Sequence, residues 1–388
     1  MPSPRDRQAR TATFVVYGVQ GLSFATVLVQ VASLQTKLEL TDGALTLLLL
    51  IVPVFAGVGS VGAGTFAARY GSKLLLRVAQ PVVALAVVLT GLAPSVPLAV
   101  PALLLFGLAV GAVDAGMNMQ GVAVERRYGT AVLNGFHSLW SVLSLAGALW
   151  AVFAADHRTS LAVTMAVPMV LAVAGSLYAG PKLCTISEEK VENVVEAPTG
   201  KFPWRPIIPL CLAMGFLYIG DAAVSNFATV FMGKALLAQD SVAKLAYSVY
   251  QGATLAVRLG GDVAVRRYGP AAIVRLGGAL ATLGFLGVVV APSQPLAIVA
   301  FGLTGLGLSV VAPQSFSAAG KLDPAGTGVA IARVNLFNYV GFIVGAALIG
   351  GLADAVDWRV AFVAPLLLAG VIIVLAPGFA PKRAVAKA

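Results

Sequence analysis

The sequence predicts an all-α membrane protein with twelve transmembrane helices arranged as two parallel six-helix repeats. Three observations support this fold class: the composition, a series of long apolar segments, and a weak internal repeat. Of the 388 residues, 59% are hydrophobic and only 11% are charged, and the mean hydropathy is +0.92. Soluble domains carry about 25% charged residues, so the surplus apolar surface requires lipid as its solvent.

The apolar segments have the length that a membrane requires. A helix crosses the hydrocarbon core with about 20 apolar residues, and the first segment is too long for a cleavable signal peptide. Prolines inside the segments, such as Pro53 and Pro168, are tolerated because neighbouring helices bond the freed backbone groups. We predict spans at residues 12–36, 44–68, 74–93, 97–124, 131–154, 160–180, 204–233, 241–265, 270–291, 294–319, 326–352 and 358–378.

The internal repeat appears as short matches at a constant offset. Arg69-Tyr70-Gly71 recurs 198 residues later as Arg267-Tyr268-Gly269. The same offset relates Arg77 to Arg275, Gly147 to Gly345, Asp156 to Asp354 and His137 to Asn335. Six spans in each half give both halves the same orientation, which is the arrangement of a parallel repeat.

A polar segment separates the two halves. We therefore divide the chain into an N-terminal bundle (1–181), a cytoplasmic linker (182–203) and a C-terminal bundle (204–388). The simplest interpretation of the linker is a solvated connection without a specific role. A short surface helix is the alternative, because acidic residues recur in it at helical spacing: Glu188, Glu189, Glu192 and Glu196.

The net charge of +10 is distributed unevenly across the predicted membrane. With the N-terminus in the cytoplasm, 19 of the 26 basic residues fall on the cytoplasmic side and 5 on the outer side. Cytoplasmic loops of membrane proteins carry such an excess of lysine and arginine. The charge pattern therefore predicts a multi-pass inner-membrane protein with both termini in the cytoplasm, and it removes the reason to expect nucleic-acid binding.

Polar residues are concentrated in particular spans. Spans three, six, nine and twelve contain no acidic residue, whereas spans one, four, five, seven, eight and eleven contain polar side chains that must face protein or water. We therefore expect those four spans to face lipid and the other eight to surround a central polar cavity. Candidate substrate-cavity residues are Gln20, Asn118, Trp140, Ser141, Asn226, Tyr250, Gln251, Arg333, Asn335 and Asn338.

Two loops and several segments within spans resemble a known family. The loop Gly64 to Lys73 resembles the signature GxxxDRxGRR of the major facilitator superfamily, with Ala68 in place of the acid. The segments 114–126 and 136–141 resemble a bacterial subgroup that contains rhizopine-transport-like proteins and is distantly related to fucose permeases. The resemblance covers essentially the whole chain. It implies the major facilitator fold and transport by alternating access.

Three titratable side chains inside spans are candidates for proton coupling: Asp114, Asp221 and His137. A carboxylate at membrane depth costs several kcal/mol when it is ionised and unpaired. Asp114 and Asp221 are therefore either proton carriers or permanently hydrogen-bonded ties between helices. A histidine titrates near neutral pH when unperturbed, but we favour a hydrogen-bonded packing role for His137, with a proton or substrate site as the alternative.

Other charged residues are interpreted as structural or gating groups. Arg258 and Asp262 lie one helical turn apart, so this pair can neutralise itself. Because Ala68 replaces the signature acid, we expect the gating network to use Glu125 instead. The glycines Gly107 and Gly111 are expected to let span four approach a neighbour closely. The gating and structural charges are Arg69, Glu125, Arg126, Arg258 and Asp262.

The predicted function is secondary active transport of a small polar solute, with a sugar-like compound as one candidate, coupled to protons. A proton-antiport exporter of a drug or metabolite and a non-transporting membrane sensor are the alternatives. The chain has no phosphate-binding glycine-lysine loop and no paired cysteine or histidine ligands. We therefore expect no enzyme activity, no metal and no cofactor, with the proton gradient as driving force. The expected partners are the solute and the bilayer, and the expected state is a monomer.

Overall fold

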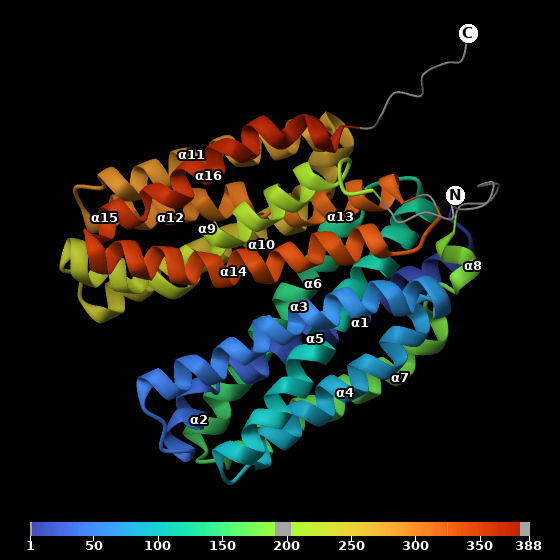
Figure 1. Ribbon diagram of the computed structural model, residues 1–388, viewed down its shortest axis with the longest axis horizontal. Coiled ribbons are helices and arrows are strands. Elements are labelled where there is room, and N and C mark those ends of the chain that lie inside the picture. Colours follow the sequence, from blue (N-terminus) through green and yellow to red (C-terminus); the bar gives the residue numbers. More distant parts are fainter. Residues whose placement is uncertain (1, 191–202, 324, 381–388) are drawn as a thin grey trace. The chain divides into compact units, whose positions relative to one another are not determined.

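The computed structural model describes residues 2–190, 203–323 and 325–380 (Figure 1). All regular elements within these residues are helices. Eleven helices in this described part of the chain are long and apolar enough to cross a membrane. A further helix, α10 (Asp240–Tyr268), has the required length with 29 residues but carries more charge. The predicted all-α membrane fold is confirmed.

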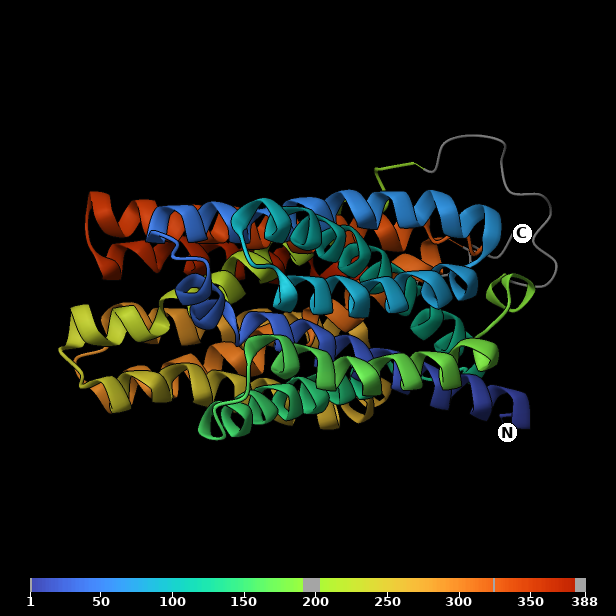
Figure 2. The same ribbon diagram turned by 90° about the horizontal axis from the view of Figure 1, so that it is seen from below.

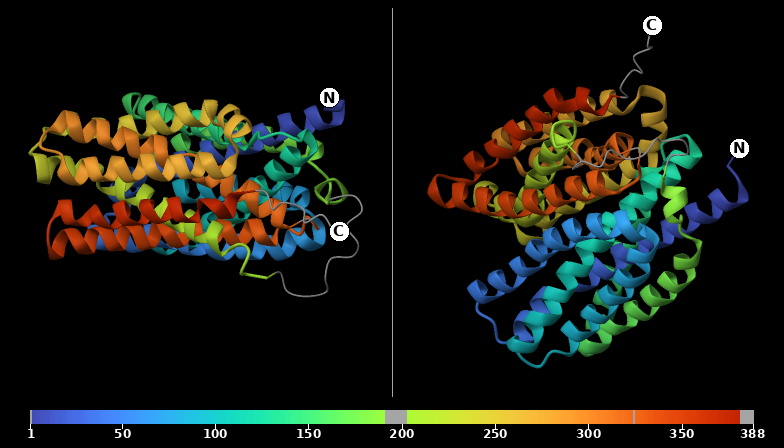
Figure 3. Two further views of the ribbon diagram at one scale, coloured as in Figure 1. Left: turned by 90° about the horizontal axis from the view of Figure 1, so that it is seen from above. Right: turned by 45° about the vertical axis from the view of Figure 1, so that its right-hand side comes forward.

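The chain divides into two compact units. The first unit contains the helices that precede the linker, together with the later segment Asp323–Tyr339. Figures 2 and 3 show the long helices of this unit running alongside one another. Its helices are α1 (Pro4–Leu28), α2 (Val31–Lys37), α3 (Asp42–Tyr70), α4 (Ser72–Leu92), α5 (Val96–Tyr128), α6 (Leu133–Asp156), α7 (Leu161–Ala179), η1 (Gly180–Lys182) and α8 (Ile186–Glu189).

The second unit contains the remaining described residues up to Leu322 and those from Val340 onwards. The helix α14 (Val329–Ala355) is therefore shared, because its first eleven residues cluster with the first unit. The other helices of the second unit are α9 (Ile208–Leu236), α10 (Asp240–Tyr268), α11 (Pro270–Val290), α12 (Gln294–Leu308), α13 (Val311–Leu322), α15 (Trp358–Ala361), α16 (Val363–Leu375) and η2 (Ala376–Phe379).

The first helix begins earlier than predicted. The hydropathy pattern predicts a span at 12–36, but α1 runs from Pro4 to Leu28. Ser3 and Asp6 form a capping box, in which the Ser3 hydroxyl accepts from the Asp6 N–H and the Asp6 carboxylate accepts from the Ser3 N–H. Proline at the first helical position adds to this signal. Hydropathy detects only the apolar part of a helix, and the cap lies outside it.

The repeat predicted from sequence is confirmed in the backbone. Gly71 ends α3 and begins α4 with φ 82° and ψ 153°, and Gly269 does the same between α10 and α11 with φ 80° and ψ 157°. Only glycine adopts such a positive φ without strain. Helices α4 and α11 then have 21 residues each, and both are followed by an alanine and, two residues later, a serine cap.

Glycines allow very close helix packing within the first unit. A Cβ atom at Gly111 of α5 would lie 1.9 Å from the carbonyl oxygen of Ala56 in α3, and one at Gly107 would lie 2.7 Å from the oxygen of Val52. The predicted role of these two glycines in close approach is confirmed. Gly59 meets α5 in the same way from the α3 side, since its Cβ would lie 2.1 Å from the Leu108 oxygen.

The helices expected to face lipid have apolar exposed surfaces. Spans three and six correspond to α4 and α7, which pack on each other, and spans nine and twelve correspond to α11 and α16, which also pack on each other. Exposed side chains on these four helices include Leu85, Val170, Leu283 and Val374. Helices α3 and α6 expose apolar side chains as well. The central polar cavity stays a prediction.

The start of the linker differs from the solvated connection that the sequence suggested. Cys184 is fully buried and Glu189 is only 5% exposed. The expectation of a solvated linker is therefore wrong for residues up to Lys190, because side chains from α1, α4 and α5 bind this segment. The short helix α8 forms there, while Glu192 and Glu196 lie outside the described residues.

Candidate functional site

The first unit contains a hydrogen-bonded carboxylate in the middle of α5, which we call the Asp114 cluster (Gln20, Asp114 and Tyr339). Gln20 of α1 is buried and donates from Nε2 to Asp114 Oδ1 at 2.7 Å. The hydroxyl of Tyr339, in the first half of α14, donates to the other carboxylate oxygen. Both oxygens of Asp114 are thus bound by neutral donors from two other helices.

Tyr17, Asn118 and His137 lie beside this cluster. The amide oxygen of Asn118 accepts from the Tyr17 hydroxyl at 2.7 Å, and its Nδ2 donates to the backbone oxygen of Asp114 at 2.8 Å. The ring of His137 packs edge-on against Tyr17, with centroids 5.1 Å apart. Asn118 therefore ties α1 to α5, and His137, which is 8% exposed, is placed next to the cluster through Tyr17.

The second unit contains a comparable group in the middle of α9, which we call the Asp221 cluster (Asp221, Ser225, Tyr247, Tyr250 and Gln251). The buried Tyr250 donates its hydroxyl to Asp221 Oδ1, and Ser225 is a further side-chain hydrogen-bond partner of this carboxylate. Gln251 donates to the Tyr247 hydroxyl at 2.9 Å, and the two tyrosine rings stack with centroids 6.4 Å apart. The guanidinium of Arg258 acts on Asp221 electrostatically.

The two clusters have similar chemistry but are not related by the internal repeat. At the offset of 198, Asp114 corresponds to Ala312 and Asp221 corresponds to Ser23. Each unit nevertheless places one carboxylate near the middle of a long helix and binds it with a tyrosine hydroxyl. A carboxylate held by neutral donors can keep its charge away from water, and it can take up a proton when a donor moves away.

The other candidate cavity residues are distributed along the helices. Asn335 is 1% exposed, and its Nδ2 donates to the Ser60 hydroxyl at 3.0 Å, so it fastens α14 to α3. Trp140 packs against Phe24 with ring centroids 6.1 Å apart. The remaining candidates have intrahelical bonds or half-buried positions: Ser141 donates to the His137 carbonyl, Asn226 is exposed and donates to the Ala222 carbonyl, and Arg333 and Asn338 are half-buried on α14.

The candidate gating charges lie in different environments. The Glu125 carboxylate accepts the backbone N–H groups of Val132 and Leu133 at 3.0 and 3.3 Å, so it caps the start of α6. Arg126 donates to the Glu189 carbonyl at 3.0 Å. Arg69 is exposed beside the Tyr70 ring, and Arg258 and Asp262 are half-buried one turn apart on α10.

Sequence reasoning singled out Tyr250 but missed three other tyrosines in or beside the two clusters. Tyr17, Tyr247 and Tyr339 were not singled out, because tyrosine within an apolar span is commonly a packing residue. A usable signal was spacing, since Tyr339 lies one turn after Asn335 and Tyr17 lies one turn before Gln20. Among the residues that the structure describes, no group of three or more His, Cys, Asp or Glu side chains is placed to hold a metal ion.

Comparison with known proteins gives a consistent result over the whole chain. The model of the Major Facilitator Superfamily matches residues 210–388. An uncharacterized MFS-type transporter of Yersinia pestis is 30% identical over 374 residues, which cover 92% of this chain and 93% of that protein. The membrane protein MosC of Rhizobium meliloti is 25% identical over 378 residues, which cover 97% of this chain and 91% of MosC.

Solved structures of transporters have the same fold. FucP, a fucose:proton symporter of E. coli, superposes with a TM-score of 0.80 at 14% identity. The superposition covers 96% of this chain and 98% of the FucP chain. The proton:xylose symporter XylE superposes with a TM-score of 0.76 at 14% identity. The superposition covers 98% of this chain and 97% of the XylE chain. At such low identity the likeness establishes the fold.

Proposed function

Because the chain belongs to the major facilitator superfamily and is a multi-pass membrane transporter, we propose that it moves a small polar solute by alternating access and couples this movement to protons. The observation that carries the proposal is the pair of clusters. Each unit holds one carboxylate in mid-helix on a tyrosine hydroxyl. Carboxylates at membrane depth are rare and mark proton and substrate pathways.

The chemistry of the two carboxylates suits a cycle of proton uptake and release. Gln20 and Tyr339 donate hydrogen bonds to the two carboxylate oxygens of Asp114 and would stabilise its charged form. If one of these donors rotates away during a conformational change, the ionised carboxylate loses its compensation and a proton replaces the lost donor. Tyr250 and Ser225 would have the same function at Asp221.

Sugars are the first candidate solutes. FucP and XylE, which have this fold, are named for proton-coupled transport of fucose and xylose. Amide and tyrosine side chains, such as Gln251 and Tyr247 of the Asp221 cluster, can bond several hydroxyl groups of one ligand. The distribution of basic residues supports a bacterial inner-membrane location with both termini in the cytoplasm.

The proposal is tested in two steps. Purified protein is first screened for thermal stabilisation by fucose, xylose and related sugars. Uptake of each stabilising sugar into proteoliposomes is then measured with and without an imposed pH gradient. We expect D114N and D221N to lower accumulation driven by the pH gradient at least tenfold. D354N is the control, because Asp354 is an exposed carboxylate at the end of α14.

Proton coupling through these residues is refuted if both variants retain gradient-driven accumulation. Efflux of the solute driven by proton entry would instead identify an antiporter. Binding of a sugar without any flux would favour a membrane sensor.

A further inference from the structure

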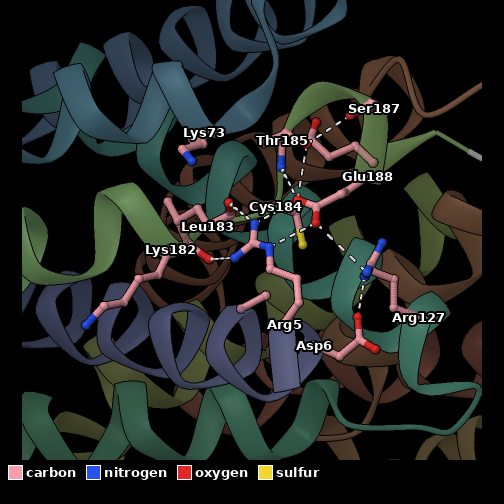
Figure 4. Close-up of polar contacts among 12 residues, drawn as sticks. Arg5, Asp6, Lys73, Arg127, Lys182, Leu183, Cys184, Thr185, Ser187 and Glu188 are labelled. Atoms are coloured by element: carbon pink, nitrogen blue, oxygen red, sulfur yellow. Dashed lines mark hydrogen bonds and ion pairs between the residues drawn. The ribbon is translucent and has the colours of Figure 1, made fainter. Parts of the chain in front are cut away.

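The segment Leu183–Lys190, which we call the strap, is fastened to the first unit through its backbone. Gln120 of α5 binds both backbone polar groups of Cys184: its Oε1 accepts from the N–H at 2.8 Å, and its Nε2 donates to the carbonyl at 3.0 Å. Arg5 of α1 donates to the carbonyl oxygen of Lys182, just before the strap, at 2.6 Å and to that of Leu183 at 2.8 Å (Figure 4). These contacts position the strap independently of its carboxylates.

One strap carboxylate forms an ion pair near the surface. Glu188 accepts two bonds from the Arg5 guanidinium, at 2.9 and 2.7 Å, and Arg127 lies 3.9 Å from it while also pairing with Asp6 (Figure 4). The Arg5 guanidinium lowers the pKa of Glu188 to about 2. This carboxylate therefore stays ionised at every physiological pH, and its ion pair is constant across that range.

The other strap carboxylate is buried. Glu189 is 5% exposed and accepts from the Ser72 hydroxyl at 2.8 Å, from the Ser72 N–H at 3.2 Å and from Gln120 Nε2 at 2.9 Å. It thereby caps the start of α4, where the residue before the helix is Gly71 and offers no side chain. This cap comes from a segment more than a hundred residues away in sequence. The stability of the first turn of α4 therefore depends on the docked strap.

The strap also contacts the loop that leads into α14. Arg126 donates to the Glu189 carbonyl at 3.0 Å. Gly326 packs so tightly on the same carbonyl that a Cβ atom there would lie 2.3 Å from its oxygen. Asp323 holds this loop by accepting from the backbone of Thr327 and Gly328 at 3.2 and 2.8 Å. In sequence the loop belongs to the second repeat, so the strap holds a segment of that repeat on the first unit.

We propose that the strap is a latch controlled by cytoplasmic pH, in which the titrating group is Glu189 and the docked strap retains Gly326 in the loop that leads into α14. The location on the cytoplasmic side rests on the orientation given under the proposed function. The latch goes beyond that function, because docking of the strap requires neither a solute nor a gradient.

The direction of the pH effect follows from burial. Burial raises the pKa of Glu189 to about 7, against the opposing effect of its hydrogen bonds and of Arg126. A solvated glutamate has a pKa of about 4.3, so docking takes up a proton at neutral pH. Docking is most favourable below about pH 4.3 and weakens as the pH rises through about 7. Between pH 6 and 8 the docking equilibrium falls roughly tenfold.

Two titratable groups of the strap beside Glu189 keep one protonation state between pH 6 and 8. Glu188 stays ionised, and burial raises the pKa of the Cys184 thiol to about 12. The charged or titratable residues that face Glu189 or flank it are Lys73 of α4, Arg126 of α5, Cys184 and Glu188 of the strap, and Asp323 of the loop beside Arg126.

The buried thiol of Cys184 provides the test. In a C211S background, the rate of maleimide labelling at Cys184 is measured on purified protein from pH 6 to 8. Each rate is divided by the rate of the E189Q variant at the same pH, which cancels the titration of the thiol itself. We expect this ratio to rise roughly tenfold from pH 6 to 8. E188Q should label faster at every pH and keep the pH dependence.

A ratio that is constant from pH 6 to 8 would overturn the latch, and so would fast labelling of E189Q at pH 6. Hydrogen exchange of the strap amides in the unmutated chain, corrected for intrinsic exchange, gives the same answer without a variant at Glu189. The contact between the strap and Gly326 is tested with G326A, in which Cys184 should react faster with maleimide. G129A is the control. Gly129 has a similar positive φ but no atom near its Cβ position. Absence of solute flux would refute the proposed function without changing these results.

Discussion

Substitution of Gly111 by alanine is the most direct test of the packing in the first unit. The Cβ atom would lie 1.9 Å from the Ala56 carbonyl oxygen, a backbone atom that no rotamer change can move. Helices α3 and α5 would have to separate by about 1 Å or more for the two atoms to reach normal contact. The contact with Gly59, on the facing helix, would open at the same time.

The magnitude follows from two opposing contributions. Overpacking of a well-packed interior costs about 1–3 kcal/mol, and a clash with backbone lies at the upper end of this range. Alanine favours the helix over glycine by about 1 kcal/mol. The net loss is therefore about 2 kcal/mol, which corresponds to a decrease in Tm of roughly 4–8 °C for a domain of about 200 residues.

The assay is thermal unfolding of the purified protein in detergent. G62A is the matched control, because Gly62 lies on α3 and has no atom within 4 Å of its Cβ position. We expect G62A to keep or slightly raise the Tm. If G111A unfolds within 1 °C of the unmutated protein, or if G62A loses as much stability, the inferred backbone contact between α3 and α5 is incorrect.

Two further predictions concern the polar clusters and the strap. Y250F removes the hydroxyl that bonds Asp221 and should lower gradient-driven transport at least tenfold while the Tm falls by only a few degrees, which flux and unfolding assays measure. R5A should accelerate maleimide labelling of the strap thiol by a similar factor at pH 6 and pH 8. The pair with Glu188 contributes above the ordinary pKa of about 4.3, and this contribution is lost only as the pH falls through about 2. If R5A accelerated labelling at only one of pH 6 and pH 8, the ion pair between Arg5 and Glu188 would not be constant across that range, and the prediction would be wrong.

The sequence predicts most helix ends because their signals are local. The glycines between α3 and α4 and between α10 and α11 adopt a positive φ, and the residues at those positions recur at the repeat offset. The apolar spans agree with the observed helices to within about four residues at most ends. The start of α1 was missed because its capping box lies in a polar segment that hydropathy does not score.

The partners of the buried carboxylates could not be predicted from sequence. Gln20 and Tyr339 lie 94 and 225 residues from Asp114, and each meets it only because three helices have particular rotations about their axes. Spacing along one helix fixes which residues share its face. It does not fix which face meets a neighbouring helix, so the bond from Asn335 to Ser60 of α3 could not be predicted.

The altered signature loop gains a new interpretation from the strap. Ala68 replaces the acid of the family pattern, and Glu125 was expected to substitute for it, but the Glu125 carboxylate caps α6. The Glu189 carboxylate reaches this loop, because it bonds Ser72 at the start of α4. In this chain an acid at the loop is therefore supplied by the docked strap. An acid fixed within the loop would always be present, whereas the contribution of Glu189 is lost whenever the strap undocks. Introducing the acid with A68D should therefore make the stability of the loop Gly64–Lys73 depend less on whether the strap is docked.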